Sequence, residues 1–260
     1  MDEKIEKLKS IAKEAGEIIK DGFFAKKSVR YKGLVDLVTE YDVATENFVK
    51  KRLAKEFKEY EIVAEESFIK KGENNKVIYL DPIDGTTNFV HSLPHVAISI
   101  AIWENEQPVY SVVYNPILDE MFWAVKGKGA FLNEKKLEVS KEEDLQRSLV
   151  ATGFPYSKVK KGAEYHWVLE SLTNLLPLVQ DIRRLGAASL DICYCAQGIF
   201  EGYYEIDLKP WDVAAGILIL QESGGKVSDI YGDDYSFDKK SIVCSNGFIH
   251  DKLIDNLAKI

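Results

Sequence analysis

Two carboxylates and two hydroxyls stand close together in the segment 81–88, which reads Asp-Pro-Ile-Asp-Gly-Thr-Thr-Asn. The segment follows an apolar run at residues 77–80 that is typical of a buried strand. Mg²⁺ prefers carboxylate oxygens, commonly one or two together with substrate phosphate, and backbone N–H groups at a glycine turn bind anions. Asp-Pro and Asp-Gly also form ordinary turns, so a capping role is the alternative for either aspartate alone. The whole segment predicts a site for metal or phosphate.

Two further acidic segments could supply oxygen ligands. Residues 62–67 have the pattern of a short apolar strand that ends in Glu65 and Glu66, and a solvated acidic turn is the simpler interpretation of this segment taken alone. Asp212 lies at the start of an expected helix, where the helix dipole favours an acid, so a cap is the simpler interpretation there. Residue types by themselves leave both segments unassigned.

Composition narrows the classes of function. The formal net charge of −8 argues against nucleic acid as the main partner, although bound cations could still attract an anionic substrate. No apolar run is long enough to span a bilayer, and three cysteines, a small and odd number, suit a reducing compartment. We therefore expect a cytoplasmic protein that does not enter a membrane.

Several familiar active-site patterns are missing or weak. The chain has no Walker-type phosphate loop and no Gly-x-Ser-x-Gly elbow, and the Gly-Lys-Gly at 127–129 is better explained by a hairpin turn. Cys193 and Cys195 lie in an apolar segment, and we expect them to pack in the core. The histidines show no metal-site spacing, so His91 and His95 are expected to pack or form hydrogen bonds.

The elements that must position these residues occur in mixed order. Helical periodicity predicts helices near residues 2–27, 42–58, 162–176, 187–198, 211–222 and 248–259. Strand patterns occur near 61–65, 76–81, 95–103, 108–115, 119–125 and 147–153, with a hairpin or loop at 32–39. No linker divides the 260 residues, which could form one large domain or two subdomains, at 1–145 and 146–260. The order predicts an α+β layered sandwich.

Taken together, these segments resemble the inositol monophosphatase family, part of a wider lithium-sensitive, Mg²⁺-dependent phosphatase superfamily. The matching segments follow the family's order and spacing from near residue 30 to near residue 225: residues 35–39, Asp42, 64–67, 81–89, 186–188, Glu205 and 211–216. The resemblance implies a layered αβαβα fold over residues 1–260, usually as a homodimer. It also implies Mg²⁺-dependent hydrolysis of a small phosphorylated cyclitol or sugar, first of all myo-inositol monophosphate.

The resemblance further implies a role for each site residue. Two or three Mg²⁺ ions would be held by Glu65, Asp81, the Ile83 carbonyl, Asp84 and Asp212, with Glu65 reaching the third ion through water. Phosphate oxygens would meet the backbone N–H groups of Gly85 and Thr86, and Thr86 and Asp42 would polarise the attacking water. The cyclitol or sugar would lie against Asp84, Ala188, Glu205 and Asp212.

Several alternatives stay open at this level. The same chemistry could act on fructose 1,6-bisphosphate, histidinol phosphate or adenosine bisphosphate; Lys209 is the candidate for a second phosphate, although a solvated lysine is the favoured interpretation. The loop from Lys32 to Asp36 is one residue shorter than in the animal enzymes, which leaves the positions of these two residues open. A non-catalytic partner of the transcription machinery is the alternative of a different class, and the intact acidic set favours an enzyme.

Overall fold

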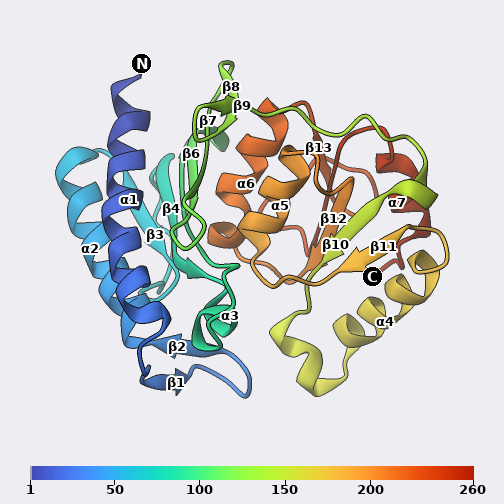
Figure 1. Ribbon diagram of the computed structural model, residues 1–260, viewed down its shortest axis with the longest axis horizontal. Helices are drawn as coiled ribbons and strands as arrows, with labels where there is room; N and C mark the ends of the chain where they lie inside the picture. The colour runs from blue at the N-terminus through green and yellow to red at the C-terminus, as the bar shows by residue number, and fades with distance from the viewer. Residues whose placement is uncertain (1) are drawn as a thin grey trace.

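The computed structural model describes residues 2–260, in which five layers stack in the order helix, sheet, helix, sheet, helix (Figure 1). The first layer holds α1 (Glu3–Phe23) and α2 (Glu40–Glu56). Asp2 caps α1, because its side chain accepts a hydrogen bond from the backbone N–H of Lys4 at 3.1 Å. The apolar stripe of α1, which includes Ile5, Leu8 and Ile11, is fully buried against the first sheet. The helix ends at Phe23, earlier than the expected residue 27.

The first sheet has seven strands in the order β3-β4-β5-β6-β7-β8-β9. Their bounds are β3 Glu61–Ala64, β4 Lys76–Asp84, β5 Ala97–Glu104, β6 Gln107–Asn115, β7 Glu120–Val125, β8 Gly129–Leu132 and β9 Lys135–Lys136. β3 and β4 are parallel, and the other neighbours are antiparallel. The pairing of β4 with β5 shifts register between Asp81 and Asp84, so β4 carries both aspartates at an irregular end.

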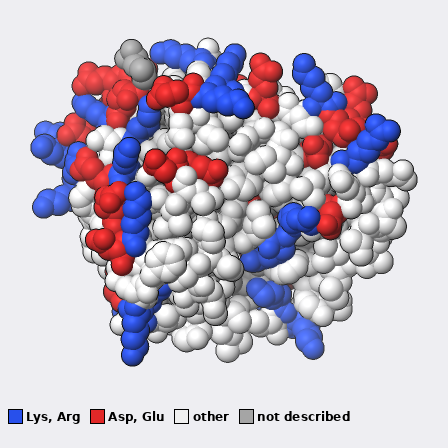
Figure 2. All heavy atoms as spheres, in the orientation of Figure 1, with Lys and Arg blue, Asp and Glu red and all other residues white. Residues whose placement is uncertain are grey.

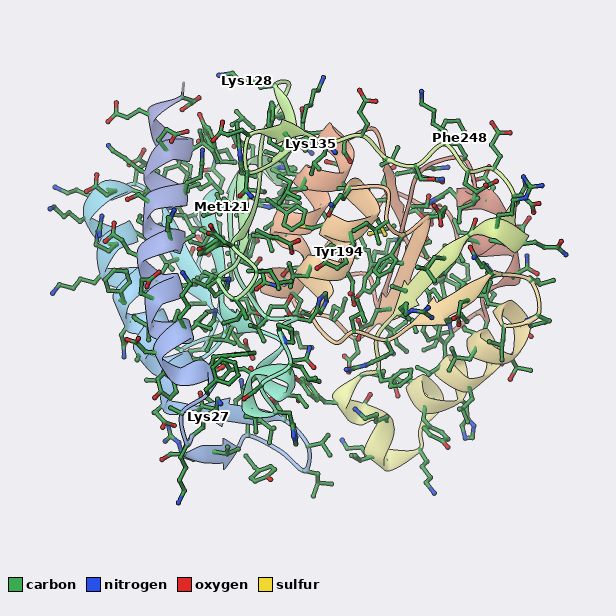
Figure 3. The ribbon with its side chains drawn as sticks, in the orientation of Figure 1. Lys27, Met121, Lys128, Lys135, Tyr194 and Phe248 are labelled. Atoms are coloured by element: carbon green, nitrogen blue, oxygen red, sulfur yellow. The ribbon has the colours of Figure 1, made fainter. Side chains whose placement is uncertain are left out.

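The middle layer holds α5 (Ala188–Ala196) and α6 (Pro210–Glu222) between the two sheets (Figure 1). The two helices approach closely, because a Cβ on Gly216 would come within 2.9 Å of the Ile192 side chain. Trp103 of β5 donates its indole N–H to the carbonyl of Ala214 at 3.3 Å, which ties α6 to the first sheet. Tyr194 projects from α5 toward the same sheet, where its hydroxyl lies 3.3 Å from Glu120 (Figure 3).

The second sheet has five strands in the order β11-β10-β12-β14-β13. Their bounds are β10 Leu149–Thr152, β11 Asp181–Arg183, β12 Gly202–Ile206, β13 Lys226–Ser228 and β14 Ser241–Ser245. Only β10 was expected from the sequence pattern. The expected α+β layered αβαβα fold is confirmed, whereas a division at 1–145 and 146–260 stays a prediction, since both sheets pack on α5 and α6.

The last layer holds α4 (Ala163–Leu175) and α7 (His250–Asn256). Short elements complete the chain: the hairpin β1 (Val29–Tyr31) and β2 (Leu37–Thr39), α3 (Thr86–Val90), and the 3-10 helices η1 (Leu145–Arg147) and η2 (Tyr156–Lys160). Charged side chains cover α1 and α2 at the left of Figure 2, while the centre of that face is largely uncharged. None of the helices within residues 2–260 combines the length and the apolar character needed to cross a membrane.

Candidate active site

A cavity of about 740 Å³ opens where the end of β4 meets the first residues of α5 and α6. Its lining contains almost all of the residues that the sequence assigned to the site: Glu65, Asp81, Ile83, Asp84, Gly85, Thr86, Ala188, Glu205 and Asp212. Asp42 lies behind this surface, in contact with Thr86. Folding therefore gathers segments that are far apart in the sequence around one space.

Thr86 and Asp42 are linked at the wall of this cavity. The Thr86 hydroxyl lies 3.0 Å from Asp42 Oδ1 and 3.1 Å from the Ile83 carbonyl oxygen. Asp42 Oδ2 accepts hydrogen bonds from the backbone N–H of Thr39 at 2.8 Å and from its hydroxyl at 2.5 Å. Thr39 and Asp42 form the capping box that begins α2, so helix formation itself fixes this carboxylate. Burial raises the pKa of Asp42, and its hydrogen bonds oppose that rise.

Asp81 and Asp84 are fixed by the irregular end of β4. Asp81 Oδ1 accepts the backbone N–H of Ile83 at 3.0 Å, and the residue is 2% exposed. Asp84 Oδ2 accepts two bonds from Ser189, from its backbone N–H at 2.7 Å and from its hydroxyl at 2.5 Å. Gly85 follows with φ +89°, and the chain then enters α3 at Thr86. A single turn thus orients two carboxylates and exposes the first N–H groups of α3.

Glu65 lies beside the hairpin loop. Lys32 Nζ lies 2.7 Å from Glu65 Oε1 and 2.9 Å from Glu66 Oε1, and 3.9 Å from Asp36 Oδ1. Asp36 Oδ1 is buried and has no hydrogen-bond partner among the residues that the structure describes. The Glu65 side chain is 19% exposed, so the simple interpretation of this segment as a solvated turn does not hold for it. Both residues of the loop whose position was open, Lys32 and Asp36, line the cavity.

Asp212 and Glu205 complete the cavity from the second half of the chain. Asp212 is the third residue of α6, and its Oδ2 accepts the backbone N–H of Lys209 at 2.6 Å. The expected capping role is therefore present, and the same side chain also faces the cavity. Glu205, on β12, accepts a hydrogen bond from the Tyr203 hydroxyl. A Cβ on Gly153 would lie 1.8 Å from Glu205 Oε2, so glycine at that position makes room for this carboxylate.

The carboxylates are close enough to disfavour one another's charge. Burial raises the pKa of Asp81 well above its usual value, and the neighbouring Glu65, Asp84 and Asp212 raise it further. Burial raises the pKa of Asp84 to about 6. Burial also raises the pKa of Glu65, the nearby charge of Lys32 lowers it and the charge of Glu66 raises it, and the result is a pKa of about 7. Such mutual repulsion is relieved when a cation lies among the groups.

The donor set fits a hard cation. The inward-facing groups are carboxylate oxygens and the Ile83 carbonyl, the oxygen ligands that Mg²⁺ prefers. As they stand within residues 2–260, no three His, Cys, Asp or Glu side chains are arranged to hold a metal ion. Lys32 Nζ, bonded to Glu65 and Glu66, supplies the positive charge on that side. Lys32 bonds Oε1 of Glu65, and no hydrogen bond to Oε2 of Glu65 is found in residues 2–260.

Sequence reasoning missed several residues of the cavity. Ser189 bonds Asp84, and Lys158 and Arg184 line the wall. Arg184 lies in a loop and Lys158 in the short η2, and a single basic residue in such segments carries no local signal for a cavity role. Ser189 was assigned only to a helix. Lys209 lies beside Asp207 at 3.6 Å with its side chain 57% exposed, which agrees with the solvated lysine that was favoured.

The cysteines and His95 behave as expected, whereas His91 does not. His95 Nε2 lies 3.0 Å from Asp191 Oδ1, which ties the loop after α3 to α5. His91 is exposed. Cys193, Cys195 and Cys244 are free and buried, in accord with the core packing that was expected for the first two.

Comparison with known proteins gives the same family as the sequence motifs. The model of the inositol monophosphatase family matches residues 1–260. Inositol monophosphatase 3 of Solanum lycopersicum is 38% identical over 251 residues, covering 95% of this chain and 93% of that protein. The Nus factor SuhB of Pasteurella multocida is also 38% identical, covering 85% and 83% of the two chains. The crystal structure of the extragenic suppressor protein suhB from Bartonella henselae superposes with a TM-score of 0.93 at 36% identity, covering 99% of each chain. The chain belongs to the inositol monophosphatase family.

Proposed function

We propose that this protein hydrolyses small phosphate monoesters with Mg²⁺ as cofactor, most directly myo-inositol monophosphate to inositol and phosphate. The observation that carries the proposal is the convergence of Glu65, Asp81, Asp84 and Asp212 on one cavity beside the Thr86–Asp42 pair. The carboxylates and the Thr86–Asp42 pair both suit a phosphatase, because a phosphate dianion repels an incoming nucleophile and spontaneous hydrolysis is extremely slow. When bound, two or three divalent ions would neutralise charge and lower the pKa of a coordinated water.

The turn after β4 would receive the phosphoryl group. The backbone N–H groups of Gly85 and Thr86 open α3, where the phosphate oxygens can accept hydrogen bonds from them. Asp81, the Ile83 carbonyl, Asp84, Asp212 and Glu65 would hold the ions on the carboxylate side. Most of the acceleration would then come from positioning and electrostatics, as is typical of phosphoryl transfer.

The Thr86–Asp42 pair would act on the attacking water. The Thr86 hydroxyl donates to Asp42 Oδ1, so an oxygen lone pair of Thr86 can accept a hydrogen bond from water. The water's proton would pass to Thr86 as the Thr86 proton passes to Asp42. Burial raises the pKa of Asp42, which strengthens it as the final acceptor. Thr39 holds the opposite oxygen of Asp42 and keeps the pair aligned.

The alcohol part of the substrate would lie toward Ala188 and Glu205. A buried carboxyl suits the hydroxyls of a neutral ring, which favours inositol, while fructose 1,6-bisphosphate, histidinol phosphate and adenosine bisphosphate are the alternative substrates. We further infer that the enzyme works in the cytoplasm as a homodimer, in keeping with its free cysteines and with the family.

A second candidate function is supported by the names of relatives. One relative at 38% identity is a Nus factor, SuhB, so a role as a partner of the transcription machinery is the competing hypothesis. A pull-down with the Asp84→Asn protein would separate the two. A partner retained by this variant would support an additional function independent of catalysis.

The proposal is tested by phosphate release from inositol 1-phosphate, fructose 1,6-bisphosphate, histidinol phosphate and adenosine 3′,5′-bisphosphate, each with Mg²⁺ and with chelator. We expect Mg²⁺-dependent release that is strongest on inositol 1-phosphate. A different preferred substrate would keep the phosphatase assignment and change the substrate. No Mg²⁺-dependent release from any of them would overturn the enzyme assignment and favour the partner role.

A further inference from the structure

The turn that carries Glu65 is held by α2 as well as by the sheet. β3 ends at Ala64, and the backbone N–H of Glu65 still donates to the carbonyl of Leu80 on β4 at 3.2 Å. The next backbone N–H, that of Glu66, donates instead to Glu46 Oε2 at 2.7 Å. Glu46 lies on α2, which packs beside β3 in the first layer (Figure 1). The helix therefore binds the backbone immediately after the sheet pairing stops.

Glu46 is buried although its side chain is acidic. The residue is 3% exposed, and Lys50 Nζ lies 3.8 Å from its Oε1. Lys50 also donates to the Ser67 hydroxyl at 2.6 Å, in the same turn. Burying a carboxylate costs free energy that an apolar side chain would avoid, so packing alone does not account for a glutamate here.

The spacing on α2 places this contact next to the Thr86–Asp42 pair. Asp42 and Glu46 are four residues apart, so they lie about one turn apart on the same face of the helix. Asp42 Oδ1 lies 3.0 Å from the Thr86 hydroxyl, and Glu46 bonds the turn after Glu65. One helix face therefore contacts both the start of α3 and the end of β3.

The bond to Glu66 also bears on the direction of the Glu65 side chain. It fixes the plane of the peptide that joins these two residues, and this plane limits the directions open to the preceding side chain. Glu65 lines the cavity, where it is one of the proposed metal ligands. Groups that orient a metal ligand commonly influence the metal affinity.

We propose that Glu46 is a positioning residue for Glu65, so that α2 orients this carboxylate as well as the Asp42–Thr86 pair. The inference rests on the proposed function, because the orientation of Glu65 matters only if this carboxylate binds Mg²⁺. Glu46 does not line the cavity, so it acts through the backbone N–H of Glu66 and not by contact with substrate.

The test is a calorimetric titration of Mg²⁺ alone into the wild-type protein and three Glu46 variants. Glu46→Leu removes the acceptor, and we expect the Mg²⁺ dissociation constant to rise by about tenfold. Glu46→Gln keeps an acceptor oxygen at the same reach, so its dissociation constant should stay within about threefold of the wild-type value. Glu46→Asp keeps the charge but is one methylene shorter, so it should resemble Glu46→Leu. The aspartate variant carries the test if the leucine variant does not fold.

Glu201 supplies a matched control. It is also a buried glutamate, 8% exposed, and its Oε2 accepts the backbone N–H of Leu149 at 2.7 Å, but it does not line the cavity. Glu201→Leu should lower the melting temperature, as Glu46→Leu does, and leave the Mg²⁺ dissociation constant unchanged. Saturating Mg²⁺ should restore most of the kcat of Glu46→Leu on inositol 1-phosphate, because Glu65 itself is intact.

The outcomes separate this inference from the proposed function. A Mg²⁺ dissociation constant that is unchanged in Glu46→Asp and in a folded Glu46→Leu protein would overturn the positioning role and leave the proposed function in place. Equal rises in Glu46→Leu and Glu46→Gln, or in Glu46→Leu and Glu201→Leu, would also overturn it, since loss of charge or of general stability would then be the cause. A wild-type protein that binds no Mg²⁺ would overturn the proposed function and this inference together.

Discussion

The two oxygens of Asp84 have different surroundings. Oδ2 accepts both donors of Ser189, the backbone N–H at 2.7 Å and the hydroxyl at 2.5 Å. No protein hydrogen bond to Oδ1 is found in residues 2–260, which leaves this oxygen available to a cation in the cavity. Groups that orient a metal-binding carboxylate in this way commonly influence the metal affinity. Ser189 is therefore a positioning residue for Asp84.

The first prediction concerns the Ser189 hydroxyl. In Ser189→Ala the backbone donor remains and the hydroxyl donor is lost, so we expect the Mg²⁺ concentration for half-maximal activity to rise by up to about tenfold. Ser189→Thr should restore most of the affinity, because it keeps the hydroxyl. Calorimetric Mg²⁺ titration and the melting temperature are measured together. An unchanged Mg²⁺ dependence in Ser189→Ala would show that the hydroxyl has no positioning role.

The second prediction concerns the charge of Asp84. Asp84→Asn keeps the size of the side chain and an oxygen for Ser189, but it removes one negative charge from the cavity. Turnover should fall by at least about a hundredfold, while the melting temperature of the metal-free protein should stay equal or rise, because repulsion among the carboxylates decreases. Asp207 is an exposed residue at the cavity edge, so Asp207→Asn is the control, and this variant protein should keep most of the wild-type activity. Near-normal turnover in Asp84→Asn would contradict the metal assignment.

At the scale of elements, the turn between β4 and α3 places most of the chemistry. Gly85 has φ +89°, and a Cβ there would lie 2.8 Å from the carbonyl oxygen of His95. Asn88 on α3 donates to that same carbonyl and to the carbonyl of Leu185, both at 2.8 Å. The turn is thus packed tightly between the loop after α3 and the loop before α5. Its position depends on glycine both for the backbone angle and for space.

The third prediction separates these two requirements. Gly127 also has a positive φ, +75°, but a Cβ there would meet no atom within 4 Å. Gly127→Ala should therefore cost only the backbone strain, about 1–2 kcal/mol of unfolding free energy. Gly85→Ala should cost clearly more, because the clash adds to the strain, and it should also lose phosphatase activity as the turn shifts. Urea unfolding measures both variants. Equal losses of stability would show that contact with His95 is unimportant.

At the scale of the whole molecule, the cavity unites both halves of the chain. Residues near β3 and β4 supply Glu65, Asp81 and Asp84, whereas β12 and α6 supply Glu205 and Asp212. Packing in five layers buries these acids together, although each would be solvated in the unfolded chain. The burial stores electrostatic repulsion among these carboxylates, and a cation bound among them would relieve it.

The fourth prediction follows from these raised pKa values. The pKa is about 6 for Asp84 and about 7 for Glu65 and Glu205, in each case with burial as the main cause, so the folded protein keeps protons that the unfolded chain releases near pH 4. The stability that these groups contribute to the metal-free protein is highest at low pH and is lost as pH rises through about 7. His250 acts in the opposite direction, since burial lowers its pKa to about 4.

The quantity to measure is therefore the difference between two melting temperatures at the same pH, because the contribution of His250 is the same in both and cancels. The melting temperature in Mg²⁺ minus that in chelator should grow as pH rises from about 5 to about 8, because the metal relieves charges that form over this range. The growth should be smaller in Asp84→Asn, which has one carboxylate fewer. A difference that stays constant across this range would contradict the electrostatic account.

Local chemistry in the sequence determined much of this protein. The Asp-Pro-Ile-Asp-Gly-Thr-Thr segment predicted a rigid acidic turn after a buried strand. The strand and helix patterns predicted α1, α2 and the strands β3 to β7 of the first sheet, but not β8 and β9. The capping role of Asp212 was also predicted correctly. These features depend on neighbours within a few residues, so a local pattern contains them. The motifs together indicated the family and the layered fold.

Tertiary structure alone decided the remainder. β12, which carries Glu205, and its partner β14 were not expected, because their pairing joins residues about forty positions apart in the chain. Asp212 has an ordinary cap position, and only packing brings it near Glu65 and Asp84. The Ser189 bond to Asp84, and the cavity wall that Lys158 shares with Arg184, likewise join separate segments. Sequence specifies local geometry, whereas the packing of layers sets which distant charges share one buried space.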